Sequence, residues 1–366
     1  MSAAPEARLP GLDLLRSLAI VWVMLFHTFL IGGLGAPWDA ITRFGWAGVD
    51  LFFVLSGFLI GSQWLGALQR REPVRLRDFY LRRAWRILPA YLVVVAVYAS
   101  APALREAPGL APLWQFLTFT LNLCIDYAQN QAFSHAWSLC VEEHFYLLFP
   151  VLALALNRRA TARGVALAGA AVVLGGIALR TALWWHGNAT QSDRPWFIED
   201  LYYPTWTRLD GLLAGVGLAA LRVARPALWQ RLQAQPGRWA VAGGLLLAAA
   251  FSLFDHRTGL PANAVGWPLL SAGLACLVLA AASPRLPAVP GMAWLAGLSY
   301  SLYLSHKLAL HAVHTWVAPA LGWQGLAMVP VYALAIAALG AALHYGVERP
   351  GLLLRDRVRR PLRVAA

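Results

Sequence analysis

The sequence has 366 residues, of which 59% are hydrophobic and 13% are charged. Soluble domains contain about 45–50% apolar and about 25% charged residues, so the composition excludes an ordinary soluble protein. Several apolar runs reach the roughly 20 residues that cross a bilayer, which predicts a polytopic membrane protein. The net charge of +13 falls in short segments between these runs. We therefore attribute it to membrane topology and not to nucleic-acid binding.

About ten segments are predicted to cross the membrane, so we expect an all-α bundle of about ten transmembrane helices. Placing the N-terminus in the cytoplasm leaves most of the 30 Lys and Arg residues in cytoplasmic segments, as the positive-inside rule requires. Both termini are therefore expected to be cytoplasmic. The predicted helices span residues 12–34, 46–66, 84–101, 137–157, 164–185, 206–221, 239–254, 265–282, 293–316 and 325–347.

The chain is expected to form a single transmembrane domain over residues 8–350, followed by a short basic cytoplasmic tail over residues 351–366. The first apolar run is too long for a signal peptide, and no small-residue cleavage site follows it. We interpret it as a retained first helix. Three cysteines are scattered without CxxC spacing, which predicts neither a disulfide framework nor a metal site. They are Cys124, Cys140 and Cys276.

The first predicted helix carries the stretch RSLAIVWVMLFH, which begins at Arg16 and ends at His27. Eleven helical steps cover about 16 Å and return to nearly the same face. Ionisable residues inside a membrane usually face the protein interior or a water-filled cavity. His27 is therefore a candidate base for a hydroxyl group in acyl transfer, and the alternative is a core histidine bonded to a neighbouring helix. Asp13, one turn before Arg16, is placed to hold that arginine.

The second predicted helix reads GWAGVDLFFVLSGFLI and contains Asp50 near its outer end. If the first two helices are antiparallel neighbours, Asp50 and His27 lie at similar depth. Asp50 would then orient the imidazole, as a carboxylate does in hydrolytic triads. The alternative is that Asp50 caps its helix in the interface.

Two arginines, Arg83 and Arg86, lie three residues apart in the run FYLRRAWR and therefore share one face of a helix. Paired guanidinium groups suit a polyphosphate, which they bind through bidentate hydrogen bonds. The alternative is positive-inside topology alone, and the spacing by itself favours that alternative.

Further polar residues interrupt the later helices. Glu142 and Glu143 are adjacent in HAWSLCVEEHFYLLFP, so at least one of them should face the interior. His306 and Lys307 lie deep within an apolar run and are further candidates to line a central cavity. The outer segment 186–205 combines charged and aromatic residues, which suits either a sugar-binding lip or an ordinary aromatic belt.

The motifs together carry a family resemblance. The chain resembles the acyltransferase 3 family of integral membrane acyltransferases, and the matching stretches occur in the family's order. They are LDLLRSLAIVWVMLFH, GWAGVDLFFVLSGFLI, FYLRRAWRILPAY, HAWSLCVEEHFYLLFP, TRLDGLLAGV, LSYSLYLSH and VERP. One departure is Lys307, which stands after His306 where the family commonly has an apolar residue or proline.

The resemblance implies ten membrane helices in a bacterial inner membrane and acyl-CoA as the donor from the cytoplasmic side. It also implies an acceptor hydroxyl on a surface glycan, a lipid-linked glycan or a secreted small molecule. The family's Arg-x10-His motif falls on Arg16 and His27, with His27 as the catalytic residue. Its Arg-x-x-Arg motif falls on Arg83 and Arg86, which would engage the donor's phosphates.

The expected function is transfer of an acyl group, most simply acetyl, from acyl-CoA to a carbohydrate hydroxyl in the lipid bilayer. Acyl-CoA is a co-substrate, and neither a permanently bound cofactor nor a metal is expected. The alternatives are a transporter of a sugar or anion, or an acyltransferase for a small-molecule glycoside; paired broken half-helices, which would support a transporter, are not evident. Expected catalytic residues are His27, Asp50, Glu142 and Glu143; expected donor-binding residues are Arg16, Arg83 and Arg86; Asp13 and His306 are expected to support them.

Overall fold

The computed structural model describes residues 9–156, 162–190 and 193–359. The regular secondary structure of the described residues is helical. The only β-type pairing among them is an isolated bridge between Leu110 and Ala132. The predicted all-α class is confirmed. Residues 351–359 of the predicted basic tail belong to a helix, α16 (Arg349–Arg359), and residues 360–366 lie outside the described part.

Each segment predicted to cross the membrane overlaps one long helix, within five residues at either end except that the helix Leu76–Ser100 begins eight residues before the predicted start at residue 84. The long helices are α1 (Pro10–Leu30), α3 (Ala47–Gln69), α4 (Leu76–Ser100), α7 (Trp137–Leu156), α8 (Ala162–Thr190), α9 (Asp210–Ala224), α11 (Pro236–Phe254), α12 (Trp267–Ala281), α13 (Met292–Ala312) and α15 (Val329–Leu343). Shorter helices connect them: α2 (Asp39–Thr42), α5 (Leu113–Leu117), α6 (Leu121–Cys124), α10 (Pro226–Gln233) and α14 (Ala318–Leu321).

Within the described residues, seven helical segments are long and apolar enough to cross a membrane, and an eighth forms if the bent pair α9 and α10 is one span. The axes of that pair differ by 114°. The helices α4 and α13 are not among the seven, and both carry arginine, histidine or lysine side chains. Ten membrane spans therefore stay a prediction, while a helical bundle with several apolar spans is established.

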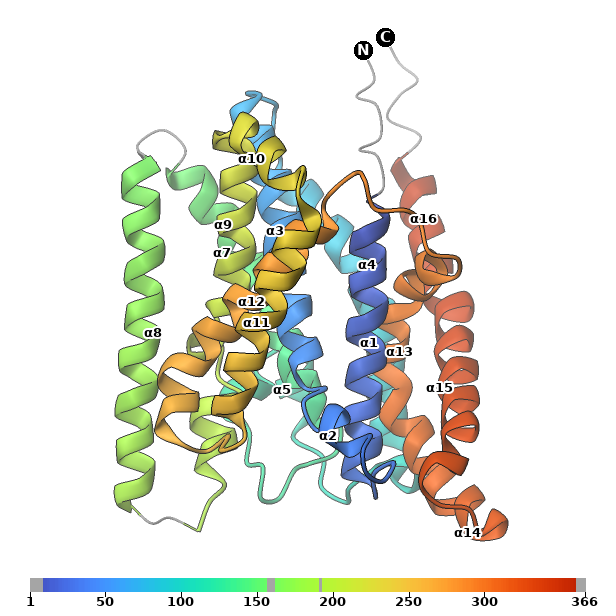
Figure 1. The fold of residues 1–366 in the computed structure, drawn as a ribbon. Helices are drawn as coiled ribbons and strands as arrows, with labels where there is room; N and C mark the ends of the chain where they lie inside the picture. The colour runs from blue at the N-terminus through green and yellow to red at the C-terminus, as the bar shows by residue number, and fades with distance from the viewer. Residues whose placement is uncertain (1–8, 157–161, 191–192, 360–366) are drawn as a thin grey trace.

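The two ends of the bundle differ in the connections they carry (Figure 1). The start of α1, the α3–α4 connection, α10 and α16 lie at one end, and α2 and α14 lie at the other. The first group contains segments that positive charge predicted to be cytoplasmic. The bundle thus keeps these basic segments together, as that prediction requires, and the side of the membrane they face stays a prediction.

The helices α3 and α9 are packed backbone to backbone through glycine. A Cβ atom added to Gly57 would lie 2.1 Å from the carbonyl oxygen of Leu212, and one added to Gly215 would lie 2.2 Å from that of Val54. Such close approach is typical of small residues at helix interfaces in membranes. Gly48 makes the same kind of contact with Ala19 on α1, so α3 lies between α1 and α9.

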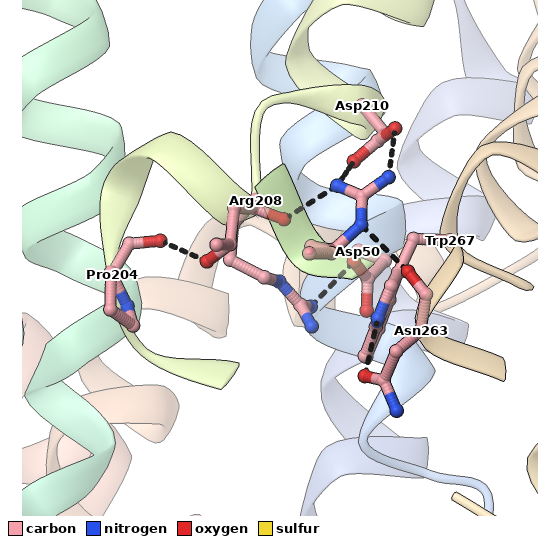
Figure 2. Close-up of polar contacts among 8 residues, drawn as sticks. Asp50, Pro204, Arg208, Asp210, Asn263 and Trp267 are labelled. Atoms are coloured by element: carbon pink, nitrogen blue, oxygen red, sulfur yellow. Dashed lines mark hydrogen bonds and ion pairs between the residues drawn. The ribbon is translucent and has the colours of Figure 1, made fainter. Parts of the chain in front are cut away.

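The long helix α8 stands at one side of the bundle (Figure 1) and exposes many apolar side chains, including Leu167, Leu174 and Trp185. One buried residue, Arg180, holds it to the rest of the fold. Its guanidinium forms a two-pronged ion pair with Asp210 at 2.7 and 3.2 Å. It also donates hydrogen bonds to the carbonyl oxygens of Thr207 and Asn263, as the dashed lines of Figure 2 show.

Candidate active site

A cavity opens among α1, α3, α4, α7 and α13 and collects charged residues from three of these helices, α1, α4 and α7. We call it the arginine cavity. All three predicted donor-binding arginines line it, and so do both predicted glutamates. Its polar lining residues are Arg16, Ser56, Arg83, Arg86, Ser138, Glu142, Glu143, Ser299 and the tyrosines Tyr146, Tyr300 and Tyr303.

Aromatic and acidic neighbours hold the arginines of this cavity. The guanidinium carbon of Arg83 lies 4.4 Å from the centre of the Tyr146 ring, within the range of a cation–π interaction. Arg86 forms an ion pair with the buried carboxylate of Glu348 at 3.7 Å. Asp13 is buried one turn before Arg16, and its negative charge favours the Arg16 guanidinium. The three cations therefore converge on one space, although Arg16 on α1 is far in the sequence from Arg83 and Arg86 on α4.

Glu142 is held by a small network at the wall of the cavity. The hydroxyl of Ser56 donates a short hydrogen bond to the Glu142 carboxylate, and the Tyr146 hydroxyl donates to Ser56 at 2.9 Å. Glu143, on the same helix turn, also lines the cavity. The expectation that at least one of the two glutamates faces the interior is confirmed.

Three imidazole rings form a second cluster, the histidine cluster, made of His27, His135 and His306. The ring centres of His27 and His306 are 4.7 Å apart, and Nε2 of His306 lies 3.1 Å from Nδ1 of His27. The ring of His135 lies 5.0 Å from that of His306 and 6.1 Å from that of His27. The cluster joins α1, α13 and the short turn Ser134–Ala136 that precedes α7.

Backbone carbonyls decide which ring nitrogens carry hydrogen in this cluster. Nδ1 of His306 lies 2.7 Å from the carbonyl oxygen of Tyr303, which can only accept, so this nitrogen is the donor. The Nε2 atom of neutral His306 is then an acceptor. Nδ1 of His27 lies near that acceptor and 2.9 Å from the carbonyl oxygen of Val23, so it too carries hydrogen. This assignment leaves Nε2 of His27 with its lone pair.

A pair of hydroxyl groups stands between the arginine cavity and the histidine cluster. Ser138 and Tyr303 both line the cavity, and their side-chain oxygens are 2.6 Å apart. The Tyr303 hydroxyl also donates to the carbonyl oxygen of His135 at 2.8 Å. None of the three histidines is among the described residues that line the cavity. The Ser138–Tyr303 pair is therefore the part of the cavity lining that contacts the histidine cluster.

The structure corrects the prediction that Asp50 orients His27. The Asp50 carboxylate is buried and accepts a hydrogen bond from Arg208 at 2.7 Å (Figure 2). Arg208 in turn stacks over the Trp267 ring, with 3.7 Å between the guanidinium carbon and the ring centre. The reason is the rotation between successive residues around the axis of α3. Gly48 faces α1. Asp50 is two residues further on, which is about 200° around the helix, and it faces α9. His306 occupies the position beside His27.

Lys307, the residue that departs from the family pattern, is paired with a carboxylate and not with a histidine. Its ammonium group forms an ion pair with Glu106 at 2.9 Å, and Glu106 also accepts a hydrogen bond from the backbone of Phe133 at 3.1 Å. Burial, the largest influence, favours the neutral carboxyl group, but the charge of Lys307 and the hydrogen bonds that Glu106 accepts together hold the pKa of Glu106 below its ordinary value. Glu106 thereby ties the connection after α4 to the turn that presents His135.

Sequence reasoning missed three residues of this site: His135, Ser138 and Tyr303. All three lie inside motifs already singled out, HAWSLCVEEHFYLLFP and LSYSLYLSH. A histidine directly before an apolar helix is a detectable signal. The hydroxyl residues gave none, because serine and tyrosine are common in membrane helices.

The comparisons with known proteins agree with the motifs. Residues 9–345 match the acyltransferase 3 family, described as an acyltransferase domain. Over 224 residues the chain is 31% identical to O-acetyltransferase OatA of Staphylococcus aureus (strain NCTC 8325 / PS 47), which covers 58% of this chain and 34% of that protein.

Over 232 residues it is 30% identical to a putative O-acetyltransferase of Staphylococcus aureus (strain COL), with 58% of this chain and 35% of that protein covered. The chain spans about a third of the length of these curated relatives. A comparison with solved structures found no significant match. Because the family match extends over most of the chain, the protein belongs to the acyltransferase 3 family and is an acyltransferase.

Proposed function

We propose that this protein transfers an acetyl group from acetyl-CoA to a hydroxyl group of a carbohydrate, with His27 as the residue that acts on the hydroxyl. The observation that carries the proposal is the course of α1. Its Arg16 lines the arginine cavity, and its His27, about 16 Å further along the helix, lies in the histidine cluster. A donor with a charged head and a long arm matches these two sites. The two relatives named as O-acetyltransferases support acetyl as the transferred group.

The donor's phosphates would bind Arg16, Arg83 and Arg86. Guanidinium groups bind phosphate oxygens through paired hydrogen bonds, and three of them around one cavity suit a polyphosphate better than a single charge. The positive-inside prediction puts this cavity on the cytoplasmic side, where acyl-CoA is found. The arm of the donor would then run past Ser138 and Tyr303, so that its thioester reaches His27.

His27 would act as a general base through Nε2. The acceptor hydroxyl loses its proton to Nε2 as its oxygen bonds to the acyl carbon, and the carbon–sulfur bond breaks. The CoA thiolate then takes the proton from the imidazolium ring, which restores neutral His27. His306 supports this step by keeping the hydrogen on Nδ1 of His27, the role that a carboxylate has in hydrolytic triads. If the acyl group is first attached to His27, the same nitrogen is the nucleophile.

A hollow beside the C-terminal end of α8 supports a carbohydrate acceptor. It is lined by Asn188, Arg194, Trp196 and Phe197, together with Pro195, Ile198 and Thr258. Arg194 is fixed there by ion pairs with Glu199 and Asp200. Aromatic and polar groups on one surface suit a sugar, which has apolar faces and hydroxyl edges. Residues 191–192 of the predicted sugar-binding lip lie outside the described part of the chain.

The proposal is tested with purified protein in detergent or lipid nanodiscs, acetyl-CoA, and a chemical assay for the released CoA thiol. The wild-type protein should release CoA, and His27→Ala should reduce the rate by about a hundredfold or more. His256→Ala, which changes an exposed histidine after α11, is the matched control and should keep the wild-type rate. Full activity of His27→Ala, or no CoA release by the wild-type protein, would contradict the proposal.

A further inference from the structure

His135 is buried, yet it lacks normal hydrogen bonds from its ring. Both ring nitrogens are shielded from solvent, and neither makes a hydrogen bond of good geometry, although the ring has a contact with the backbone of Leu304. The residue is nevertheless held firmly by its backbone, because its carbonyl oxygen accepts the hydroxyl hydrogen of Tyr303 at 2.8 Å. The ring is edge-on to Tyr303 and His306, with centres 5.5 and 5.0 Å away. The fold thus fixes the position of this ring but gives its nitrogen atoms no well-formed hydrogen bond.

Unused polar atoms in a protein interior carry a cost of about 1–3 kcal/mol each. Buried polar groups are therefore nearly always paired, and an exception indicates a partner that binds in the working protein. A neutral imidazole offers one donor and one acceptor. A hydroxyl group can accept the His135 N–H and still donate its own hydrogen to a second base. A thioester carbonyl oxygen only accepts, so it could not bridge His135 to a basic nitrogen.

The position of His135 relative to His27 points to the same ligand. Their ring centres are 6.1 Å apart and the rings are tilted by 60°, so they neither stack nor bond directly. A single oxygen atom between such rings can lie within hydrogen-bond range of a nitrogen on each. Nε2 of His27 has a lone pair for the hydrogen of a hydroxyl, because His306 and Val23 occupy Nδ1. The lone pair of the same oxygen is then free to accept from His135.

We propose that His135 is the residue that binds the acceptor hydroxyl and holds it against His27. This inference rests on the proposed function and adds the acceptor side of the reaction to it. The hydroxyl donates its hydrogen to Nε2 of His27 and accepts the ring N–H of His135. When the proton moves to His27, the oxygen bonds to the acyl carbon and the carbon–sulfur bond breaks. His135 keeps its own hydrogen throughout.

The location of His135 places the acceptor on the opposite side of the Ser138–Tyr303 pair from the donor. His135 follows the long connection between α4 and α7, which includes α5 and α6. Glu106, in the same connection, bonds to the backbone of Phe133 and to Lys307. Donor and acceptor would then reach His27 from opposite ends of the bundle.

The test separates acceptor binding from donor binding. The full-length protein in nanodiscs is given acetyl-CoA with glycerol or an oligomer of N-acetylglucosamine as hydroxyl probes, and CoA release and acetylated probe are measured. In His135→Ala the concentration of probe needed for half-maximal acceleration should rise by about tenfold or more, as expected for the loss of one hydrogen bond. The KM for acetyl-CoA should stay within about twofold of wild type, because His135 does not line the arginine cavity.

Two further variants guard against misfolding. His135→Asn or His135→Gln keeps an N–H donor and should recover part of the response to the probe. His144→Ala removes a histidine of α7 that bonds to Thr205, outside the cluster, and should behave as wild type towards the probe. Thermal unfolding midpoints of all variants show whether the fold is intact.

Other outcomes overturn the inference in recognisable ways. An unchanged probe response in His135→Ala would show that His135 does not bind the hydroxyl. A rise in the KM for acetyl-CoA as large as the change in the probe response would place His135 on the donor or in the fold. A wild-type protein that releases CoA but responds to neither probe would exclude a general hydroxyl site in the cluster. If the wild-type protein releases no CoA at all, the proposed function itself fails.

Discussion

Nε2 of His306 lies 3.1 Å from Nδ1 of His27, and this contact joins two residues that are 279 positions apart in the sequence. It fixes the side of the His27 ring that carries hydrogen, because His306 is itself fixed by the carbonyl oxygens of Leu302 and Tyr303. Two helices, α1 and α13, thus contribute one functional unit. The sequence predicted the Asp50 carboxylate as the partner of His27, and the structure has the neutral imidazole of His306 in its place.

Replacing His306 by alanine should lower kcat by about tenfold or more, because His27 loses the group that holds its tautomer. The KM for acetyl-CoA should change little, since His306 does not line the arginine cavity. CoA release at saturating acetyl-CoA gives kcat. His311→Ala, on the same helix and outside the cluster, is the control. A large rise in KM with unchanged kcat would assign His306 to donor binding instead.

Replacing Arg83 by alanine should raise the KM for acetyl-CoA by about tenfold or more, the loss expected for a charged hydrogen bond. Arg83→Lys should recover only part of this loss, because an ammonium group cannot bind phosphate in a bidentate manner. Titration of acetyl-CoA in the thiol-release assay measures the effect. Arg77→Ala, an exposed position earlier on α4, serves as the control and should keep the wild-type KM.

Removing the Arg180 side chain should destabilise the protein by about 3–5 kcal/mol, because Asp210 would remain buried without its partner. The thermal unfolding midpoint in detergent should fall clearly. The control is Arg43→Ala, which breaks an exposed ion pair with Asp255 and should cost about 0–1 kcal/mol. Equal midpoints for the two variants would show that α8 does not depend on this contact.

The position of Gly57 should not accommodate even the methyl group of alanine. The added methyl group of Gly57→Ala would meet the Leu212 carbonyl oxygen, so α3 and α9 must separate, at about 1–3 kcal/mol. Gly217→Ala is the matched control on α9, since nothing lies within 4 Å of its added Cβ atom. Thermal unfolding should therefore show a lower midpoint for the first variant and an unchanged or higher one for the second.

The ion pair between Lys307 and Glu106 should make stability depend on pH in the acidic range. The pKa of Glu106 is lower in the folded protein than in the unfolded chain, so its contribution is present above the unfolded value and disappears as pH falls through the folded one. The difference in thermal midpoint between wild type and Glu106→Gln should shrink as the pH is lowered from neutral to acid. A difference in thermal midpoint that does not change with pH would mean that the pKa of Glu106 is the same in the folded and unfolded protein.

Periodicity and charge predicted much of the site without coordinates. Arg16, Arg83 and Arg86 do line one cavity, and both adjacent glutamates reach it. These residues could be found because a charge in an apolar helix is costly and must face the interior. Asp50 could not be assigned in the same way, because burial alone does not say which neighbour a carboxylate meets. Its partner, Arg208, comes from a turn 158 residues further along the chain.

The sequence by itself determined that the chain is a bundle of apolar helices. It also determined which helices carry ionisable side chains and that Arg16 and His27 share one helix face. Local chemistry is enough for this, because helical geometry and the cost of charge in lipid act within one segment. Only the tertiary structure decided that His27 meets His306 and His135, and that Asp50 meets Arg208. These contacts depend on how each helix is rotated against its neighbours, and glycine contacts such as Gly48 with Ala19 set that rotation.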